Sequence, residues 1–201
     1  MLVLRNLSLP ARLLLVIDDS PTKRYGPYVE GADIHRNPTP GPADQKYLYG
    51  HIWVTISLAL RHPQWGAMAL PLRAMLYVRQ RTIATIPRWR RWRFATKLQL
   101  AARLAEWLVP LLKEGGKTVW IVIDGGYAKR PFLRRVLKLS HVVVVGRLRK
   151  DARLRDLPPK LKRGQRRGRG RPRKYGKNKL SLAKRAGQKR GWRTVHCTVY
   201  G

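Results

Sequence analysis

Two apolar runs in this chain each end in a bare carboxylate, and this feature most restricts how the chain can fold. Residues 13–19 read LLLVIDD and residues 118–124 read TVWIVID. Continuous apolar runs of this length predict buried strands. The chain has only 10 Asp and Glu residues against 44 Lys and Arg. Acids placed at the ends of two buried strands, in so basic a protein, predict a shared functional site.

The charge of the chain restricts its partners. Its net charge is +34 at pH 7 and its pI is about 11.7. Self-repulsion of this size is best tolerated beside a polyanion, so nucleic acid is the favoured partner. An acidic membrane surface is the alternative, but we find no basic amphipathic helix suited to lie on lipid. No apolar run approaches the ~20 residues of a membrane span, and the single Cys197 allows no internal disulfide. We therefore expect a cytoplasmic protein.

The first half of the chain reads as strands. Residues 13–18 predict a strand that ends at polar residues and Pro21. Residues 20–46 are rich in proline and predict a long structured loop. The β-branched and aromatic residues of 47–60 predict a second strand, and residues 67–78 a third. Pro71 within the third strand indicates an edge position or a bulge.

Helical spacing begins at residue 95. Apolar residues then recur every three or four positions as far as Leu112, which predicts a helix. A fourth strand is predicted over 118–124. Pro131 suits the first turn of a short helix, which should bury Phe132, Val136 and Leu137. Residues 141–146 read HVVVVG and predict a fifth strand covered on both faces.

This order of elements predicts the fold class. Three strands are followed by a helix, a strand, a helix and a strand. We therefore expect an α/β domain with a ribonuclease H-like mixed sheet, in which three antiparallel strands precede alternating helices and parallel strands. Residues 1–146 would form a partial version of this core. The whole chain would then be one domain, or one domain with an appendage.

The composition changes sharply after residue 146. Residues 147–193 contain 21 Lys or Arg and two Asp. Most of such a segment cannot bury enough surface to fold by itself. We expect residues 147–191 to be a basic, partly flexible insertion that binds nucleic acid. Residues 192–201 return to strand-like alternation and would rejoin the core.

The strand-end acids suit a divalent metal. Phosphodiester cleavage by two metal ions needs oxygen ligands close together, and Mg²⁺ prefers a few carboxylates with water and phosphate. The first and fourth strands lie side by side in a core of this order, so Asp18 or Asp19 would meet Asp124. Adjacent strand residues point to opposite faces, so only one of the pair should be a ligand. The alternative is that these acids cap turns, above all Asp124 in Asp-Gly-Gly.

Five segments together resemble the DDE-type transposases of bacterial insertion sequences. They are residues 16–26 (VIDDSPTKRYG), 49–54 (YGHIWV), 61–72 (RHPQWGAMALPL), 122–127 (VIDGGY) and 169–176 (RGRPRKYG). The resemblance covers nearly the whole chain, and the segments occur in the family's order.

The resemblance implies a function for the acids. The family places a catalytic Asp before any residue and then Thr or Ser, which Asp18 and Ser20 match better than Asp19. The second family Asp precedes a small residue and an aromatic, which matches Asp124. These residues would bind Mg²⁺ or Mn²⁺ for cleavage of double-stranded DNA and strand transfer. In the family, pairing of two transposon ends implies a dimer, such as a homodimer, or a larger assembly. The resemblance also implies a bacterial protein that associates with the nucleoid.

The family's third ligand is a Glu on a later helix, and the chain departs from the pattern there. No acidic residue follows Asp156. Glu106 and Glu114 lie between the first two acids, on the wrong helix for this role. The expectation is a catalytic-core fragment with two of three ligands, truncated at both ends.

Residues 87–97 (PRWRRWRFATK) interleave Trp89, Trp92 and Phe94 with four arginines. Aromatics that stack on bases beside cations that bind phosphates would make a strand-binding patch. The alternative is that the tryptophans anchor the following helix in the core while the arginines face water. The candidate nucleic-acid-binding residues of the whole chain are Arg88, Arg90, Arg91, Arg147, Arg149, Lys150, Lys162, Arg163, Arg166, Arg167, Arg169, Arg171, Arg173 and Lys174.

The favoured function is therefore the catalytic core of a DNA transposase. Two alternatives stay open. A non-enzymatic basic nucleic-acid-binding protein would explain the charge but not the two acids. An inactive, truncated transposase remnant would keep the fold without the activity.

Overall fold

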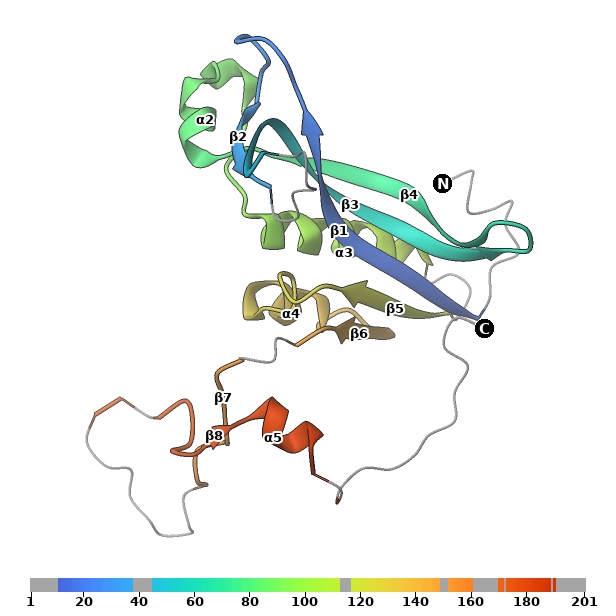
Figure 1. The fold of residues 1–201 in the computed structure, drawn as a ribbon, viewed down its shortest axis with the longest axis vertical. Coiled ribbons are helices and arrows are strands. Elements are labelled where there is room, and N and C mark those ends of the chain that lie inside the picture. Colours follow the sequence, from blue (N-terminus) through green and yellow to red (C-terminus); the bar gives the residue numbers. More distant parts are fainter. Residues whose placement is uncertain are drawn as a thin grey trace. The chain divides into compact units, whose positions relative to one another are not determined.

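The computed structural model describes residues 11–37, 45–112, 117–148, 152–160, 170–171, 173–188 and 190 (Figure 1). The chain divides into two compact units, Met1–Arg147 and Leu148–Gly201. Each unit is described by itself below. None of the helices in these ranges has both the length and the apolar character needed to cross a membrane.

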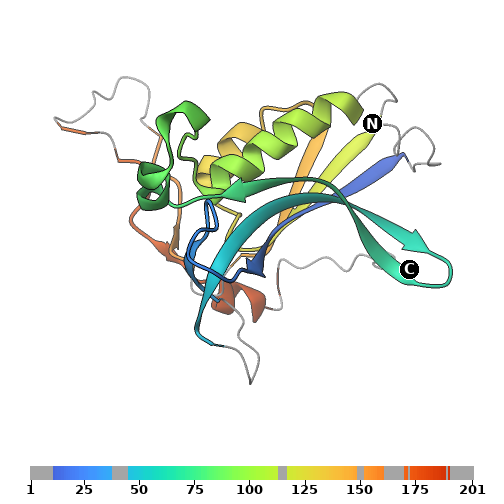
Figure 2. The same ribbon diagram turned by 90° about the horizontal axis from the view of Figure 1, so that it is seen from above.

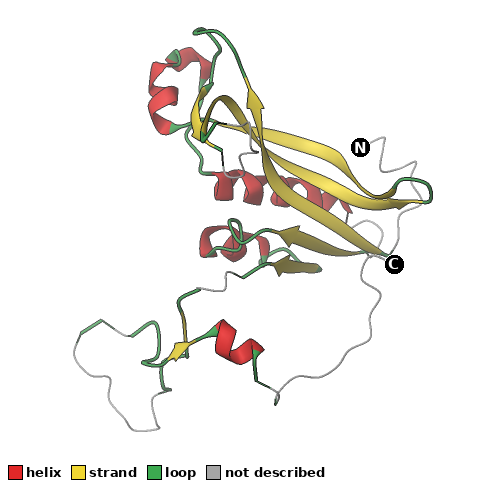
Figure 3. Cartoon of the chain, viewed as in Figure 1, coloured by secondary structure: helices red, strands yellow, loops and turns green. Residues whose placement is uncertain are grey.

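A six-stranded mixed sheet forms the first unit in its described part, and yellow arrows mark its strands in Figure 3. The central strand β1 pairs antiparallel with β3 on one side and parallel with β5 on the other. Strand β6 continues the parallel half, while β2 and β4 both pair antiparallel with β3. The strands are β1 (Arg12–Lys23), β2 (Asp33–Arg36), β3 (Tyr47–His62), β4 (Gly66–Tyr77), β5 (Thr118–Ile123) and β6 (Val142–Gly146).

Helices cover one face of this sheet. The long helix α3 (Lys97–Leu112) lies across it in Figure 2, and α4 (Arg130–Val136) packs against α3. Alternate residues of β1 (Leu13, Leu15 and Ile17) are fully buried against this layer, as the period of a strand requires. Two short elements precede α3, namely the helix α2 (Gln80–Thr85) and the 3₁₀-helix η1 (Arg88–Arg90). The predicted ribonuclease H-like order of strands and helices is confirmed.

Strand β1 is longer than predicted. It continues past both aspartates to Lys23, so the expectation that it ends at Pro21 is wrong. The extension is held by β3, because β1 pairs with β3 as far as Lys23 and Gly50. Strand β5 stops at Ile123, so the extension has only one neighbouring strand, and proline is tolerated in such an edge. Asp18 and Asp19 are therefore inside β1 and mark the end of its parallel pairing.

Two other expectations are corrected at the sheet edge and beside it. Val143 and Val145 of β6 are about two-fifths exposed, so this strand is covered on one face only. Leu137 is 60% exposed, because α4 ends at Val136 and Leu137 is its C-cap. Phe132 and Val136 are buried, as predicted.

Strand β4 has both features that Pro71 indicated. It is an edge strand that pairs only with β3, and its register shifts beside the proline. Arg73 pairs with Ile56 and Pro71 with Ser57, so Leu72 is an extra residue in the strand. The missing proline N–H therefore falls at a bulge on an edge, where it costs little pairing.

Asp156 connects two segments of the second unit. Strand β7 (Leu154–Arg155) pairs with β8 (Lys179–Leu180), and the short helix α5 (Leu182–Ala186) follows. The Asp156 side chain accepts hydrogen bonds from the backbone and side chain of Asn178, at 3.3 and 2.8 Å. The basic segment thus holds more regular structure than its composition predicts. The strand predicted over 192–201 lies outside the described residues.

Candidate active site

Strand register brings Asp18 and Asp124 together. Ile17 of β1 and Ile123 of β5 are the last parallel pair, and each is followed directly by an aspartate. Ile17 and Ile123 are buried toward the helices, while Asp18 and Asp124 are exposed. Because successive strand residues alternate between faces, Asp18 lies on the face of the sheet opposite α3. The predicted convergence of these two acids therefore follows from a single register.

The electrostatics of Asp18 reflect its acidic neighbours. Desolvation by the surrounding protein raises the pKa of Asp18, and the charges of Asp19 and Asp124 raise it further. The backbone N–H of Asp19 donates a 2.8 Å hydrogen bond to Asp18 Oδ1 and opposes this rise. A carboxylate that lies in the negative field of neighbouring carboxylates favours a cation beside it. Asp18 and Asp124 therefore form a charge pair that a divalent cation would stabilise.

Asp124 also caps a turn, so this alternative interpretation of it is correct in part. The backbone N–H of Tyr127 donates to Asp124 Oδ1 at 3.0 Å and to the Asp124 carbonyl at 3.2 Å. Gly126 makes room for the carboxylate, because a Cβ there would lie 3.1 Å from both carboxylate oxygens. Within the described part of the chain, Oδ2 of Asp124 accepts no hydrogen bond. The turn thus orients the carboxylate and leaves one oxygen available.

Asp19 has a different environment. Its Oδ2 accepts a 2.6 Å hydrogen bond from Lys97 Nζ, and its Oδ1 accepts one of 2.8 Å from the Tyr127 hydroxyl. Tyr127 is buried, and desolvation together with the charge of Asp19 raises the pKa of its phenol. Both oxygens of Asp19 are therefore occupied. Of the two acids that the sequence left open, the geometry favours Asp18 as the ligand.

Sequence reasoning missed Lys97 and Tyr127. Lys97 is the first residue of α3, where its cation meets the acids directly. Tyr127 was visible only as the aromatic of the strand-end motif, and its contact with Asp19 spans 108 positions. These two residues position Asp19, whose backbone N–H in turn contacts Asp18.

The donor set fits a divalent metal with a partial protein shell. Asp18 and Asp124 offer carboxylate oxygens, which are the ligands that Mg²⁺ takes together with water and phosphate. Among the residues described, no group of three or more His, Cys, Asp or Glu is placed to hold a metal ion. Glu106 forms an ion pair with Arg135, and Asp156 contacts Asn178. Neither is free to serve as a third acid, and Glu114 lies outside the described ranges.

The predicted nucleic-acid-binding residues divide between the two units. Arg88, Arg90 and Arg91 lie in and beside η1, and Arg147 follows β6. Arg171, Arg173 and Lys174 belong to the second unit. All seven are exposed. The remaining candidates lie outside the described residues and are Arg149, Lys150, Lys162, Arg163, Arg166, Arg167 and Arg169.

The mixed sheet, its helical layer and the two convergent acids define a ribonuclease H-like α/β domain of the nuclease class. A family model described as DDE superfamily endonuclease matches residues 2–199, and the chain belongs to this family. The family resemblance expected from five short segments is thereby confirmed. DNA is the substrate that this family implies. Searches of curated proteins and of solved structures found no match.

Proposed function

We propose that this chain is the catalytic-core portion of a transposase that cleaves and joins DNA strands during transposition of an insertion sequence. The pairing of Asp18 with Asp124 carries the proposal, because it places two carboxylates at one point of a strongly basic protein. Family membership supports the same reaction class. In this reaction the oxygen of water attacks a phosphodiester, and a DNA strand leaves with a free 3′-hydroxyl. That hydroxyl then attacks a phosphodiester of the target DNA, so its oxygen becomes bonded to the target phosphorus while the 3′-oxygen of the target strand leaves and takes up a proton.

The residues of the chain would divide this work. Asp18 and Asp124 would hold Mg²⁺ or Mn²⁺ against the reacting phosphate. Such a cation stabilises charge on the phosphoryl oxygens and lowers the pKa of a bound water. Tyr127 orients Asp124 through its backbone N–H, while Lys97 and the Tyr127 hydroxyl fix Asp19. A homodimer holding two transposon ends belongs to the same proposal.

The basic residues would bind the DNA backbone. Arg147 and the exposed cations of the second unit suit phosphate contacts, which position DNA without reading its sequence. Affinity for duplex DNA should therefore fall steeply with salt and change little with sequence. Tight, salt-insensitive binding to one sequence would contradict this assignment.

Binding of Mn²⁺ tests the acid pair. We expect the 201-residue chain to bind Mn²⁺ in calorimetry, and Asp18→Asn and Asp124→Asn each to weaken binding by at least about tenfold. Glu30→Gln is the matched control, since it removes one negative charge from the same unit, and it should leave the affinity unchanged. Equal Mn²⁺ affinities of Asp124→Asn and wild type would reject the metal site and favour a non-enzymatic DNA-binding protein.

A further inference from the structure

Three aromatic side chains before α3 are exposed instead of buried. Trp89 is 70% exposed, whereas Trp92 and Phe94 are 36% and 41% exposed. The alternative that the tryptophans anchor the helix in the core is wrong for Trp89, while Trp92 is covered over most of its surface and Ala95 is the buried residue at this point. We refer to Trp89, Trp92 and Phe94 as the aromatic platform.

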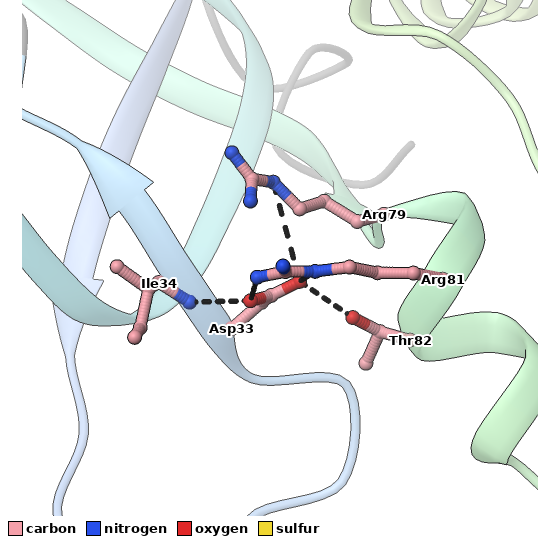
Figure 4. Close-up of polar contacts among 5 residues, drawn as sticks. All are labelled: Asp33, Ile34, Arg79, Arg81 and Thr82. Atoms are coloured by element: carbon pink, nitrogen blue, oxygen red, sulfur yellow. Dashed lines mark hydrogen bonds and ion pairs between the residues drawn. The ribbon is translucent and has the colours of Figure 1, made fainter.

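An ion cluster around the buried carboxylate of Asp33 fixes the chain before the platform (Figure 4). Asp33 of β2 is almost fully buried and accepts hydrogen bonds from Arg81 and from Thr82 Oγ1, the latter at 2.7 Å. The backbone N–H of Ile34 also donates to it, at 2.6 Å. The Arg79 guanidinium lies 4.0 Å from the same carboxylate. Helix α2 is thereby attached to the sheet, and the residues after it leave from a fixed point.

Further contacts hold the platform itself. Arg90 forms an ion pair with Glu30 at 3.6 Å, and its guanidinium lies 4.3 Å from the centre of the Trp89 ring. Gly31 has a φ of +78°, and a Cβ there would lie 3.8 Å from the Trp92 ring. The segment before β2, which contains Glu30 and Gly31, therefore packs against the platform and its neighbour Arg90. The aromatic rings are presented by a braced segment and keep accessible faces.

The platform is attached to the acid site. Tyr77, at the end of β4, pairs with Ile52, which pairs in turn with Pro21 of β1. The residues that follow β4 therefore begin at the end of the sheet where β1 continues past Asp18. After the platform, Phe94 lies three residues before Lys97, which contacts Asp19. Three residues span at most about 10 Å of backbone, so the segment that carries the platform leads directly into the lysine that contacts Asp19, on the helical side of the sheet.

The chemistry of this surface suits unpaired nucleotides. Arg88, Arg91 and Arg93 are exposed beside the rings, and within the described residues none of them forms an ion pair. Aromatic faces stack on bases, whereas neighbouring guanidinium groups bind phosphates. A protein partner with an apolar face would leave these cations uncompensated. Bases inside a duplex already stack on one another and do not present their faces.

We propose that the aromatic platform binds single-stranded nucleotides of the DNA on which the acid pair acts, with Trp89 as the principal stacking residue. This inference rests on the proposed function for its location but not for its chemistry. The platform would thus recognise unpaired bases, whereas the exposed cations elsewhere would bind the phosphates of duplex DNA.

Matched tryptophan variants test the proposal. Trp65 is 72% exposed, at the turn between β3 and β4, and stacks on His62. Binding of the 201-residue chain to a labelled oligothymidine would be measured by anisotropy at roughly 0.3 M salt, where phosphate contacts are weakened. We expect Trp89→Ala to lower the affinity about tenfold, and Trp89→Phe to retain most of it. Trp65→Ala should bind like wild type.

Duplex DNA completes the test. Trp89→Ala should bind a duplex of the same length within about twofold of wild type, because stacking requires free base faces. Equal losses in Trp89→Ala and Trp65→Ala, or equal losses for oligothymidine and duplex, would overturn the proposal. Trp89→Ala should leave the Mn²⁺ affinity unchanged, so failure of the metal site and failure of the platform give different results.

Discussion

Lys97 Nζ lies 2.6 Å from Asp19 Oδ2, and this contact joins the start of α3 to the acid beside Asp18. It places one cation next to a group of three carboxylates. The same ammonium lies over the Tyr77 ring, 5.7 Å from its centre. Lys97 therefore balances the charge of the site from the helical side of the sheet. The opposite side, where Asp18 is exposed, is left for an external cation.

Replacement of Lys97 by Met should destabilise the protein most when divalent ions are absent. Without the lysine cation, the carboxylates of Asp18, Asp19 and Asp124 would repel one another. The free energy of unfolding should therefore fall by about 1 kcal/mol in EDTA. Mn²⁺ should narrow this difference, since binding to the folded state stabilises it. Urea unfolding with and without Mn²⁺ measures both effects. The exposed Lys138→Met is the control, and an identical loss in both buffers would contradict the role given to Lys97.

Tyr127→Phe should remove one hydrogen bond and keep the ring packing against Phe132. We expect the free energy of unfolding to fall by about 1–2 kcal/mol. Folding raises the pKa of the Tyr127 phenol, so its contribution is complete below the ordinary tyrosine pKa of about 10 and is lost as the pH rises further. The difference between wild type and Tyr127→Phe should therefore shrink in alkaline solution. Urea unfolding at a series of pH values measures it, and a constant difference would contradict this assignment.

The sequence predicted those parts of the fold that depend on local pattern. β-branched, aromatic and continuous apolar runs placed β3, β4 and β5, and the helical apolar period placed α3. The convergence of Asp18 and Asp124 was predicted because strand order alone decides it. Contacts between distant residues, such as Lys97 with Asp19, depend on how a helix start lies against the sheet. No local pattern encodes that relationship.

The same limit applies to the region around Asp33. Strand β2 has four residues and α2 has six, which are too short to show a period. What stabilises them is the buried carboxylate of Asp33 with Arg81 and Thr82, whose side chains are 48 and 49 positions away. The extension of β1 past Pro21 was missed for a related reason. Its pairing with β3 outweighs the local signal of the proline.

Asp33→Asn should test how much this cluster stabilises the fold. Hydrogen bonds from Arg81 lower the pKa of Asp33, with Thr82 and Ile34 adding to the effect. A lowered pKa means stability that is complete above the unfolded value of about 3.9 and is lost as the pH falls below it. At pH 7 we expect the substitution to cost about 2–3 kcal/mol.

The loss should depend on pH. Thermal unfolding of wild type and Asp33→Asn between pH 6 and pH 2 should show curves that approach each other below about pH 4. Glu30→Gln, which removes an exposed ion pair, should cost less than about 1 kcal/mol. A constant difference between wild type and Asp33→Asn across this range would show that the carboxylate charge is not what stabilises α2.

Gly50→Ala should disrupt the extension of β1. Gly50 pairs with Lys23, and a Cβ at Gly50 would lie 2.1 Å from the carbonyl oxygen of Thr22, so a backbone must move. We expect a loss of about 3 kcal/mol in urea unfolding, in the range of an overpacked core. Gly66→Ala is the comparison, because a Cβ there meets nothing within 4 Å. The only expected cost is the backbone strain of its φ of +69°, about 1 kcal/mol. Equal losses would mean that β1 beyond Asp19 moves freely, and the acid pair would then lack the rigid strand that positions Asp18.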